Sequence, residues 1–303
     1  MIYGIIDVGS NTIRLSLYKY ENKKIVRLLN KKTMAGIIGY VKKGELSKEG
    51  IKIACEVLNE YKDIVKKFDV DNVYVFATAS LRNISNTDEA ISIIKENTGF
   101  SIDIILGEDE GIYDFVGAKQ ILDIENGLLI DIGGGSTEIV KYENNDIKKA
   151  YSIPVGSLNM YSKYVNKIIP TKDERDTIKE KVLYYLDNLS GLESSKIACG
   201  VGGTIRSTGK LCTKIFKKKN EDKMIISSEI IKKLFKKLDE DEKMVIDKIL
   251  KVVPDRVHTI IPGLVILKTI VNYYDIKEIY ISPYGVREGY LFSKVLQGGI
   301  YEK

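Results

Sequence analysis

Histidine, cysteine and long apolar runs are scarce in this chain of 303 residues. Its one histidine, His258, excludes a histidine-rich metal site and a Ser/His/Asp triad built on several histidines. The three cysteines are an odd set without metal-ligand spacing, and Cys55 and Cys199 stand in apolar patterns, so we expect buried, reduced thiols. No run has the length of a membrane span and no basic segment precedes a signal-type apolar stretch, which predicts a cytoplasmic protein without a membrane partner.

The chain does contain a globular balance of residues, with 44% hydrophobic and 29% charged. Its length favours two domains over one. The formal net charge is only +5, and an AT-rich genome would explain the abundant lysine, isoleucine and asparagine equally well. We therefore expect no nucleic-acid partner.

Two stretches share one pattern, in which an aspartate ends an apolar strand and a turn of small residues follows. The first, Ile6 to Thr12, reads IDVGSNT, and the second, Ile130 to Thr137, reads IDIGGGST. An alternating strand follows each turn, so both stretches predict a β-hairpin with an aspartate at the mouth of its turn. Asp131 follows Asp7 by 124 residues.

Two further pairs extend this repeat in the same order. Arg82, after the strand-like VYVFATA, is followed at the same interval of 124 residues by Arg206, after IACGVGG. Glu110 and Glu288 each precede a glycine after a β-rich run, but they lie 178 residues apart. The surplus predicts a helical insertion in the second half, at about 207–256. A chain of similar halves with alternating strands and helices predicts an α/β fold of two duplicated domains with a cleft between them.

The predicted domains are 1–123 and 124–303, and a C-terminal helix at about 288–303 is a candidate to pack back on the first domain. Ser47 has the position of a cap for a helix whose apolar face runs from Ile51 to Phe68. Thr171 and Glu174 have capping-box spacing before a second helix.

The repeated turns have the chemistry of phosphate cradles. Glycine lets the backbone approach a ligand closely, and successive N–H groups in a tight turn attract anions. Hydroxyl and amide side chains add donors. A lone glycine turn would be read as an ordinary hairpin, but two at matching positions favour phosphate binding. The candidate residues are Ser10, Asn11 and Thr12 in the first half and Gly133, Gly134, Gly135 and Ser136 in the second, with Gly202, Gly203 and Thr204 as a third such turn.

Asp7 and Asp131 stand beside these turns, where unpaired carboxylates would repel phosphate. A Mg²⁺ ion would resolve the conflict, because it takes one or two carboxylates together with water and phosphate oxygens. Glu138 is a further candidate ligand or a strand residue facing solvent. The triplet Glu108-Asp109-Glu110 is either a set of caps for a following helix or the source of a general base. Arg82 is a surface residue or a phosphate clamp, and His258 is read as structural.

The two hairpins resemble the phosphate motifs of the superfamily of acetate and sugar kinases, Hsp70 and actin, which has duplicated ribonuclease H-like domains. Within it, the motifs DVGSNTIRL, ATASLRNISN, GEDEG, DIGGGSTEI, GVGGT and SPYGVREGYL are similar, in order, to those of the exopolyphosphatase and guanosine pentaphosphate phosphohydrolase (Ppx/GppA) family. The resemblance spans Tyr3 to about Leu291, and the serine and asparagine after the first glycine are its most specific part.

This resemblance implies an Mg²⁺-dependent hydrolase that releases the terminal phosphate of inorganic polyphosphate or of pppGpp, a stringent-response nucleotide. It implies that Glu110 activates water, that Asp131 and Glu138 serve Mg²⁺ or another divalent cation, and that Arg82 contacts phosphate. A bound monovalent cation and a homodimer are further candidates. Long members continue with a helical HD-type domain and another C-terminal domain, which this sequence does not contain, so we expect short polyphosphates to be preferred and hydrolysed distributively.

One departure from the family lies after Gly156, where Leu158-Asn159-Met160-Tyr161 replaces a run that in many short members contains an arginine. Two alternatives remain open on the residues. An ATP-dependent kinase of the same superfamily would need an adenine pocket and an acceptor site. A non-catalytic actin-like scaffold or nucleotide sensor would not need Glu110.

Overall fold

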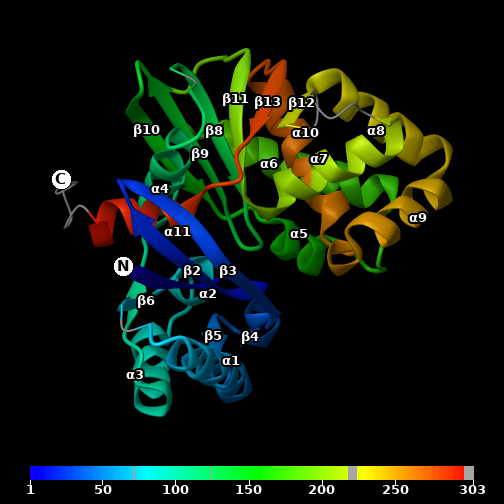
Figure 1. The fold of residues 1–303 in the computed structure, drawn as a ribbon. Coiled ribbons are helices and arrows are strands. Elements are labelled where there is room, and N and C mark those ends of the chain that lie inside the picture. Colours follow the sequence, from blue (N-terminus) through cyan, green and yellow to red (C-terminus); the bar gives the residue numbers. More distant parts are fainter. Residues whose placement is uncertain (71, 124, 218–223, 297–303) are drawn as a thin grey trace. The chain divides into compact units, whose positions relative to one another are not determined.

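The computed structural model describes residues 1–70, 72–123, 125–217 and 224–296. Contacts between residues divide the chain into two compact units, Met1–Gly107 and Glu108–Lys303, each with its own β-sheet (Figure 1). The division predicted between residues 123 and 124 stays a prediction, as does the cleft between the halves. The part of the predicted C-terminal helix beyond Leu296 lies outside the described residues.

The first unit contains a five-stranded sheet in the order β3-β2-β1-β6-β7 and a small pair, β4 and β5. Strands β1, β2 and β3 form an antiparallel meander, and β6 and β7 add to it in parallel. The strands are β1 (Ile2–Val8), β2 (Thr12–Glu21), β3 (Lys24–Met34), β4 (Val41–Lys42), β5 (Glu45–Leu46), β6 (Asn72–Ala77) and β7 (Ile102–Ile104), and the helices are the 3₁₀ turn η1 (Ile37–Tyr40), α1 (Lys48–Lys67), α2 (Ala79–Arg82) and α3 (Thr87–Thr98).

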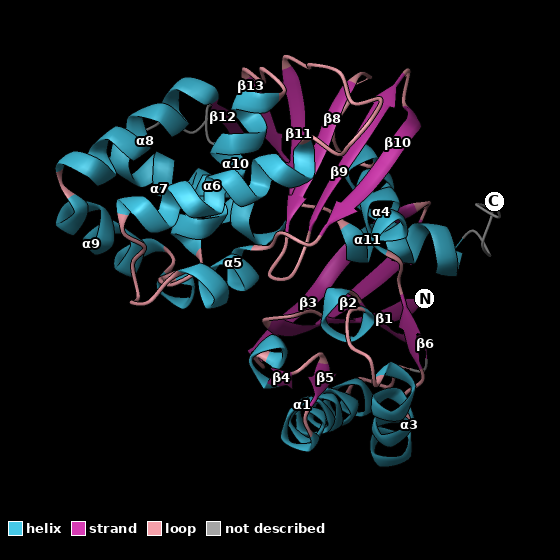
Figure 2. Ribbon diagram, turned by 180° about the vertical axis from the view of Figure 1, so that it is seen from behind, coloured by secondary structure: helices cyan, strands magenta, loops and turns pink. Residues whose placement is uncertain are grey.

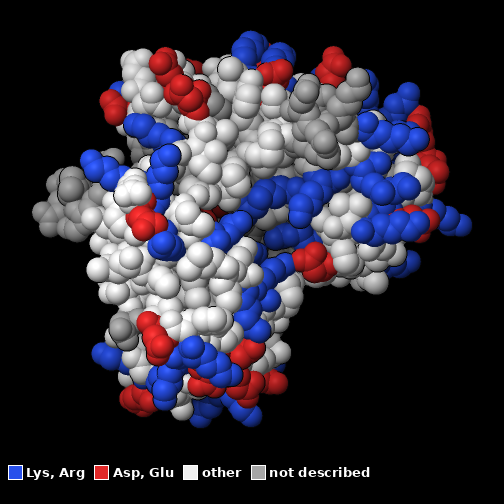
Figure 3. Space-filling model, viewed as in Figure 1, with Lys and Arg blue, Asp and Glu red and all other residues white. Residues whose placement is uncertain are grey.

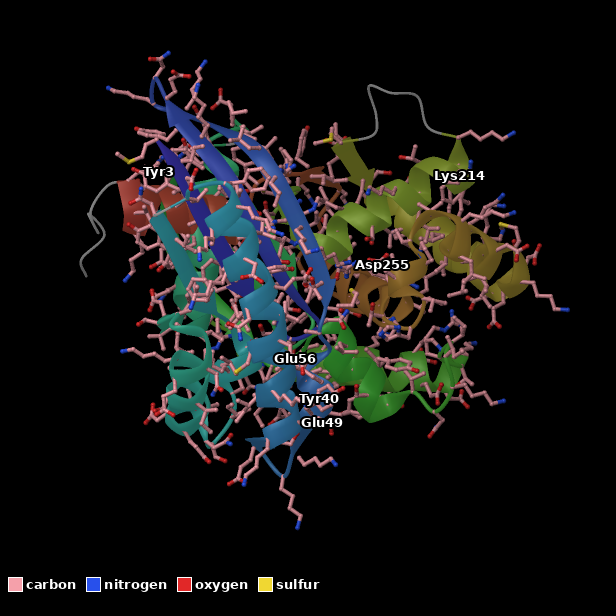
Figure 4. The ribbon with its side chains drawn as sticks, turned by 60° about the horizontal axis from the view of Figure 1, so that its bottom comes forward. Tyr3, Tyr40, Glu49, Glu56, Lys214 and Asp255 are labelled. Atoms are coloured by element: carbon pink, nitrogen blue, oxygen red, sulfur yellow. The ribbon has the colours of Figure 1, made fainter. Side chains whose placement is uncertain are left out.

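One face of this sheet packs on α1 and α3, because alternate residues of β1 and β2 are apolar and buried together with those helices. Ser47 caps α1 as predicted, accepting a hydrogen bond from the N–H of Gly50. Tyr40 lies against the same turn, where a Cβ on Gly50 would stand 2.6 Å from the Cβ of Tyr40 (Figure 4). Phe68 was wrongly predicted to be on the buried face: it follows the last residue of α1 and is 58% exposed.

The second unit contains a six-stranded sheet in the order β10-β9-β8-β11-β13-β12. Its strands are β8 (Gly127–Ile132), β9 (Thr137–Glu143), β10 (Asp146–Ile153), β11 (Ile197–Val201), β12 (Ile225–Ser227) and β13 (Glu278–Ile281). Its helices are α4 (Gly107–Lys119), α5 (Ser157–Tyr164), α6 (Lys172–Leu186), α7 (Gly202–Phe216), α8 (Ser228–Glu240), α9 (Glu242–Val252), the 3₁₀ turn η3 (Pro254–Arg256), α10 (Ile260–Tyr273), α11 (Val286–Tyr290) and the π-helical η4 (Leu291–Leu296).

The two faces of this sheet carry different layers. Alternate residues such as Ile130 and Ile139 face the main core, which α6, α7 and α10 complete. Leu129 and Val140 face the other way and pack with Phe115 of α4. Figure 2 shows the helices of the main core to one side of the strands and α4 with α11 to the other. Because side chains alternate along a strand, Asp131 and Glu138 share the α4 face with Leu129 and Val140.

The predicted duplication is confirmed by the strand order, since β3-β2-β1-β6-β7 matches β10-β9-β8-β11-β13. It extends to side-chain hydrogen bonds. The hydroxyl of Ser80 donates to the carbonyl of Val8, and the hydroxyl of Thr204 donates to the carbonyl of Ile132 at 2.7 Å. The predicted α/β fold of two similar halves is therefore present.

Two simpler expectations are also met. All three cysteines are buried, and burial raises the pKa of Cys55 and raises that of Cys199 to about 12. The capping box of Thr171 and Glu174 begins α6 as predicted. In the described part of the chain, no helix is both long enough and apolar enough to cross a membrane.

Candidate functional site

Two carboxylates face each other across the hairpin of the second unit. Asp131 near the end of β8 is directly opposite Glu138 on β9. Like charges at opposite positions of an antiparallel pair repel, with Cβ atoms about 5 Å apart. Glu138 is buried, and its Oε1 accepts a hydrogen bond from the hydroxyl of Ser152 at 2.7 Å. The pair is therefore held in place in a position that favours a bound cation.

The first-unit hairpin differs at the matching position. Asp7 is opposite Arg14 on β2, so the counterpart of Glu138 is a cation rather than an acid. The guanidinium of Arg14 also donates to Asn30 at 3.2 Å. Asp7 thus has a protein cation across the ladder, whereas Asp131 faces a second acid. The metal role predicted for Asp7 stays a prediction.

The glycine turn between β8 and β9 is fixed through its carbonyl oxygens. The N–H of Ser157 donates to Gly133 at 2.9 Å, and the N–H of Leu158 donates to Gly134 at 3.0 Å. The side-chain amide of Asn159 donates to Gly135 at 3.1 Å. No hydrogen bond to another described residue uses the N–H groups of Gly134 and Gly135. Two backbone N–H groups and the side chain of Asn159 therefore hold the carbonyl oxygens of this turn.

The first-unit turn is fixed in the same way. The N–H of Gly36 donates to Asn11 at 3.0 Å, and the N–H of Ile38 donates to Ser10 at 3.0 Å. Ser10 is buried, and Asn11 and Thr12 are half-buried. Both turns are thus held through their carbonyl oxygens. Their binding of phosphate stays a prediction.

Helix α7 begins against Asp131. Gly202 has φ +75°, and a Cβ placed on it would lie 1.9 Å from Oδ1 of Asp131. Only glycine suits this position, since both the backbone conformation and the space exclude a side chain. The first turn of a helix is also the end that stabilises negative charge. On the next residue, a Cβ at Gly203 would lie 2.0 Å from Nη2 of Arg256, so this arginine lies over the same turn.

Helix α4 brings two more acids to the same face of the sheet. Glu110 is buried in its first turn, and Asp114 follows one turn later and is fully buried. A Cβ on Gly111 would stand 2.8 Å from Val140 and 3.5 Å from the Cβ of Glu138, so the helix lies directly on β9. Glycine after Glu110 is what permits this close packing.

The pKa of Asp114 reflects the acids that lie close to it. Burial raises its pKa well above the ordinary value, and the charges of Asp131, Glu110 and Glu138 raise it further. The backbone N–H of Val286 opposes the shift. Asp114 also lies against the backbone of Gly285, where an added Cβ would be 2.9 Å from Oδ1. It is therefore a carboxyl group that the fold favours in the protonated state.

Three arginines surround these acids within the second unit. Arg206 donates to the carbonyl of Ser282 at 3.3 Å, and its pKa is lowered by burial and by the charge of Arg287, against the opposite effects of Asp131 and Glu288. Burial lowers the pKa of Arg256 as well, and Asp255 and Asp131 oppose that shift. Carboxylates and guanidinium groups together form a site that can accept an anion and a cation at once.

Arg82, predicted as a phosphate contact, lies in the first unit at the position that corresponds to Arg206. It donates to the carbonyl of Ile105 at 2.9 Å, as Arg206 donates to Ser282 at 3.3 Å. One nitrogen of each guanidinium thus has a structural partner just after β7 or β13. His258 is half-buried and packs edge-on against Tyr161 at 5.1 Å, in keeping with a structural role.

The residues present fit a magnesium ion at Asp131 and Glu138. In the described part of the chain no group of three or more His, Cys, Asp or Glu side chains is arranged to hold a metal ion. Mg²⁺ does not need one, because it is commonly held by one or two carboxylates plus water and phosphate oxygens. The opposed pair of acids supplies that number.

The sequence predictions located Glu110, Asp131, Glu138 and the glycine turn, and the second unit brings these together on one face of its sheet. They did not include Asp114, Arg256 or Arg287. A signal existed for Asp114, which follows Glu110 by four residues and therefore lies one helical turn away. No sequence signal existed for Arg256, because it contacts the turn at Gly203 from η3, which lies about fifty residues later in the chain.

Comparison with known proteins places this geometry in a family. Residues 20–298 match the model of the Ppx/GppA phosphatase family. The bifunctional 3-dehydroquinate synthase/phosphatase of Fusobacterium nucleatum is 29% identical over 295 residues, which cover 91% of this chain and 44% of that protein. The chain thus spans less than half the length of that relative. Exopolyphosphatase 1 of Mycobacterium tuberculosis is 21% identical, with 97% of this chain and 88% of that protein covered.

A solved structure agrees with this match. The Ppx/GppA family member of Aquifex aeolicus is 26% identical and superposes with a TM-score of 0.80, covering 98% of both chains. The family model covers most of the chain, including the turn between β8 and β9, the acids of α4 and the start of α7. The chain belongs to the Ppx/GppA phosphatase family.

Proposed function

We propose that this protein hydrolyses phosphoanhydride bonds and releases the terminal phosphate of inorganic polyphosphate. The observation that carries the proposal is the gathering of Glu110, Asp131 and Glu138 beside a glycine turn. Hydrolysis of a phosphoanhydride needs positioning and neutralisation of charge more than covalent chemistry, and these groups supply both. Exopolyphosphatase is also the activity in the name of the M. tuberculosis relative.

Each group has a defined task in this proposal. The N–H groups of Gly134 and Gly135 and the hydroxyl of Ser136 hold oxygens of the terminal phosphate. Asp131 and Glu138 hold Mg²⁺, which when bound neutralises charge on the phosphate. Glu110 accepts a proton from the attacking water. The water oxygen then bonds to phosphorus while the bond from phosphorus to the anhydride oxygen breaks.

The start of α7 also belongs to the proposed site, because Gly202, Gly203 and Thr204 lie there beside Asp131. In the first unit, Ser10, Asn11, Thr12 and Arg82 are proposed to bind phosphate oxygens in their own right. The hydroxyl of Thr204 already donates to Ile132, so only its backbone is available as a donor. pppGpp is the second candidate substrate, since its terminal phosphate presents the same anhydride.

Measurement of phosphate release with Mg²⁺ tests the proposal. Polyphosphates of graded length, pppGpp and ATP are compared at equal concentrations of terminal phosphate. We expect release from polyphosphate without any added acceptor. Turnover of ATP that requires an acceptor would instead indicate a kinase. Release of phosphate from pppGpp alone would make pppGpp, in place of polyphosphate, the substrate. No release from any of them would contradict the proposal.

Glu110→Gln tests the role of the general base. Glutamine keeps the size of the side chain and cannot accept the proton, so we expect turnover to fall by about a hundredfold or more. Glu108→Gln is the matched control, because Glu108 lies on the same turn of α4 and is exposed. Thermal unfolding should be similar in both variants. Near-normal turnover of Glu110→Gln would show that another group accepts the proton of the attacking water.

A further inference from the structure

A groove of about 780 Å³ in the second unit is lined by residues of α7 and α9, Arg206 among them. Its cations are Arg206, Lys210, Lys214, Lys217 and Lys248. Figure 3 shows lysine and arginine side chains gathered over these two helices, and Figure 4 marks Lys214 on α7. The described residues that line the groove include no aspartate or glutamate. Its described lining therefore carries positive charge only.

The cations of α7 follow one face of the helix. Arg206, Lys210 and Lys214 are four residues apart, and at 1.5 Å per residue they span about 12 Å. Lys210, Lys214 and Lys248 form no ion pair with a described residue. Like charges at this spacing repel one another, by a few tenths of a kcal/mol per pair. A linear anion bound along the helix would offset that repulsion, because it would attract each of these cations.

The chemistry of the walls distinguishes between anions. Among the described lining residues, no side chain carries a carboxylate or an amide that could read the edge of a nucleobase. None is aromatic either, whereas proteins that bind single-stranded nucleic acids usually stack bases on aromatic rings. The lining also includes the apolar residues Met224, Val252, Ile281 and Pro283, a kind of surface on which lysine stems can pack. These walls favour an anion that is recognised by charge alone.

The groove and the candidate site share helix α7. This helix begins at Gly202 against Asp131, and Arg206, about one turn further along the helix, lines the groove. We propose that the groove binds the trailing part of a polyphosphate chain whose terminal phosphate occupies the site at Asp131 and Glu110. This inference rests on the proposed function, and it adds a binding track on α7 and α9 that lengthens the substrate the second unit can hold.

The test removes three groove lysines together. In Lys210→Gln/Lys214→Gln/Lys248→Gln, we expect KM for polyphosphates of several tens of units to rise about tenfold or more, while KM for tripolyphosphate changes less than twofold. The slope of log affinity against log salt concentration should become shallower by about 2, which is about 0.7 for each of the three contacts removed. The matched control is Lys232→Gln/Lys233→Gln/Lys236→Gln on α8, which carries the same change in charge outside the groove.

Direct binding separates this inference from the proposed function. Binding of labelled long polyphosphate, measured without Mg²⁺ so that none is hydrolysed, should weaken in the groove variant and stay unchanged in the control. Equal affinity of the groove variant and the parent protein would overturn the inference even if both hydrolyse polyphosphate. Binding that depends on the groove in a protein without hydrolysis would contradict the proposed function alone. Tighter competition by single-stranded RNA than by polyphosphate would assign the groove to nucleic acid and also overturn the inference.

Discussion

At the residue scale, the two repeats differ in the charge of the residue that faces the hairpin aspartate. Arg14 faces Asp7 in the first hairpin, and Glu138 faces Asp131 in the second. The first pair joins an acid to a base across the ladder and the second joins two acids, although both hairpins have the same backbone arrangement. A cation requirement therefore belongs to the second hairpin in our interpretation, because only there does the fold oppose two acids.

Asp131→Asn tests this asymmetry. Asparagine keeps a ligand oxygen but removes one charge, so we expect a higher Mg²⁺ concentration for half-maximal activity together with lower maximal activity. Asp146→Asn is the control, since Asp146 is exposed on β10. Titration of activity with Mg²⁺ measures both effects. An unchanged Mg²⁺ dependence in folded Asp131→Asn would argue against a metal at this pair.

Asp114 predicts a dependence of stability on pH. Its pKa in the folded protein is raised by burial and by three neighbouring acids, so the folded state binds more protons than the unfolded state does. Stability should then fall as pH rises above the unfolded value of about 3.9. Asp114→Asn should remove that loss, because an amide does not ionise. Melting temperatures of both proteins across pH 4 to about 8, in EDTA, measure the difference, and parallel curves would refute this role for Asp114.

At the scale of elements, helix starts position the site. α4 lies on β9 through Gly111, and α7 begins against Asp131 through Gly202. α4 also meets α11 closely, since a Cβ on Gly289 would stand 1.7 Å from the carbonyl oxygen of Tyr113. Glycines at these contacts set the distance between helix and strand, and thus the distance between the acids that they carry.

Gly202→Ala should separate close packing from backbone strain. Gly202 and Gly191 have nearly the same φ, +75° and +71°, but an added Cβ at Gly191 would meet only Lys149, at 3.4 Å or more. Both substitutions incur the strain of positive φ, on the order of 1 kcal/mol. Only Gly202→Ala also displaces Asp131, so we expect the larger loss of stability and a loss of activity in that variant alone. Chemical denaturation and phosphate release measure the two effects, and equal losses in both variants would contradict this account.

At the scale of the whole molecule, the chain has two compact units with separate cores. The first core joins β1 and β2 to α1 and α3, and the second joins β8 and β9 to α6, α7 and α10. Large proteins with separate cores often depart from two-state unfolding. Each core should therefore have its own local stability.

Matched core truncations test this independence. Leu58 in α1 and Leu186 in α6 are both fully buried, each in its own core. Leu→Ala at such sites costs about 2–5 kcal/mol. We expect Leu58→Ala to reduce hydrogen-exchange protection mainly in β1, β2 and β6, and Leu186→Ala to reduce it mainly in β8, β9 and β11. An equal loss of protection in both units from either variant would show one cooperative core instead.

The sequence by itself determined the local features of this protein. Alternation of apolar residues predicts the hairpins, Ser47 and Thr171 predict two helix starts, and repeated glycine turns predict the duplication, because these depend on neighbours along the chain. The family motifs also predict that Glu110, Asp131 and Glu138 act together, and their roles stay a prediction.

Only the tertiary structure decided which charges gather around that set. Burial of Asp114 depends on α4 packing against the sheet, and the position of Arg256 over Gly203 depends on η3, more than fifty residues away along the chain. The lysine row of α7 becomes a groove only because α9 and the end of β13 form its other walls. Such placements follow from packing between distant segments, and no period or spacing within one segment encodes them.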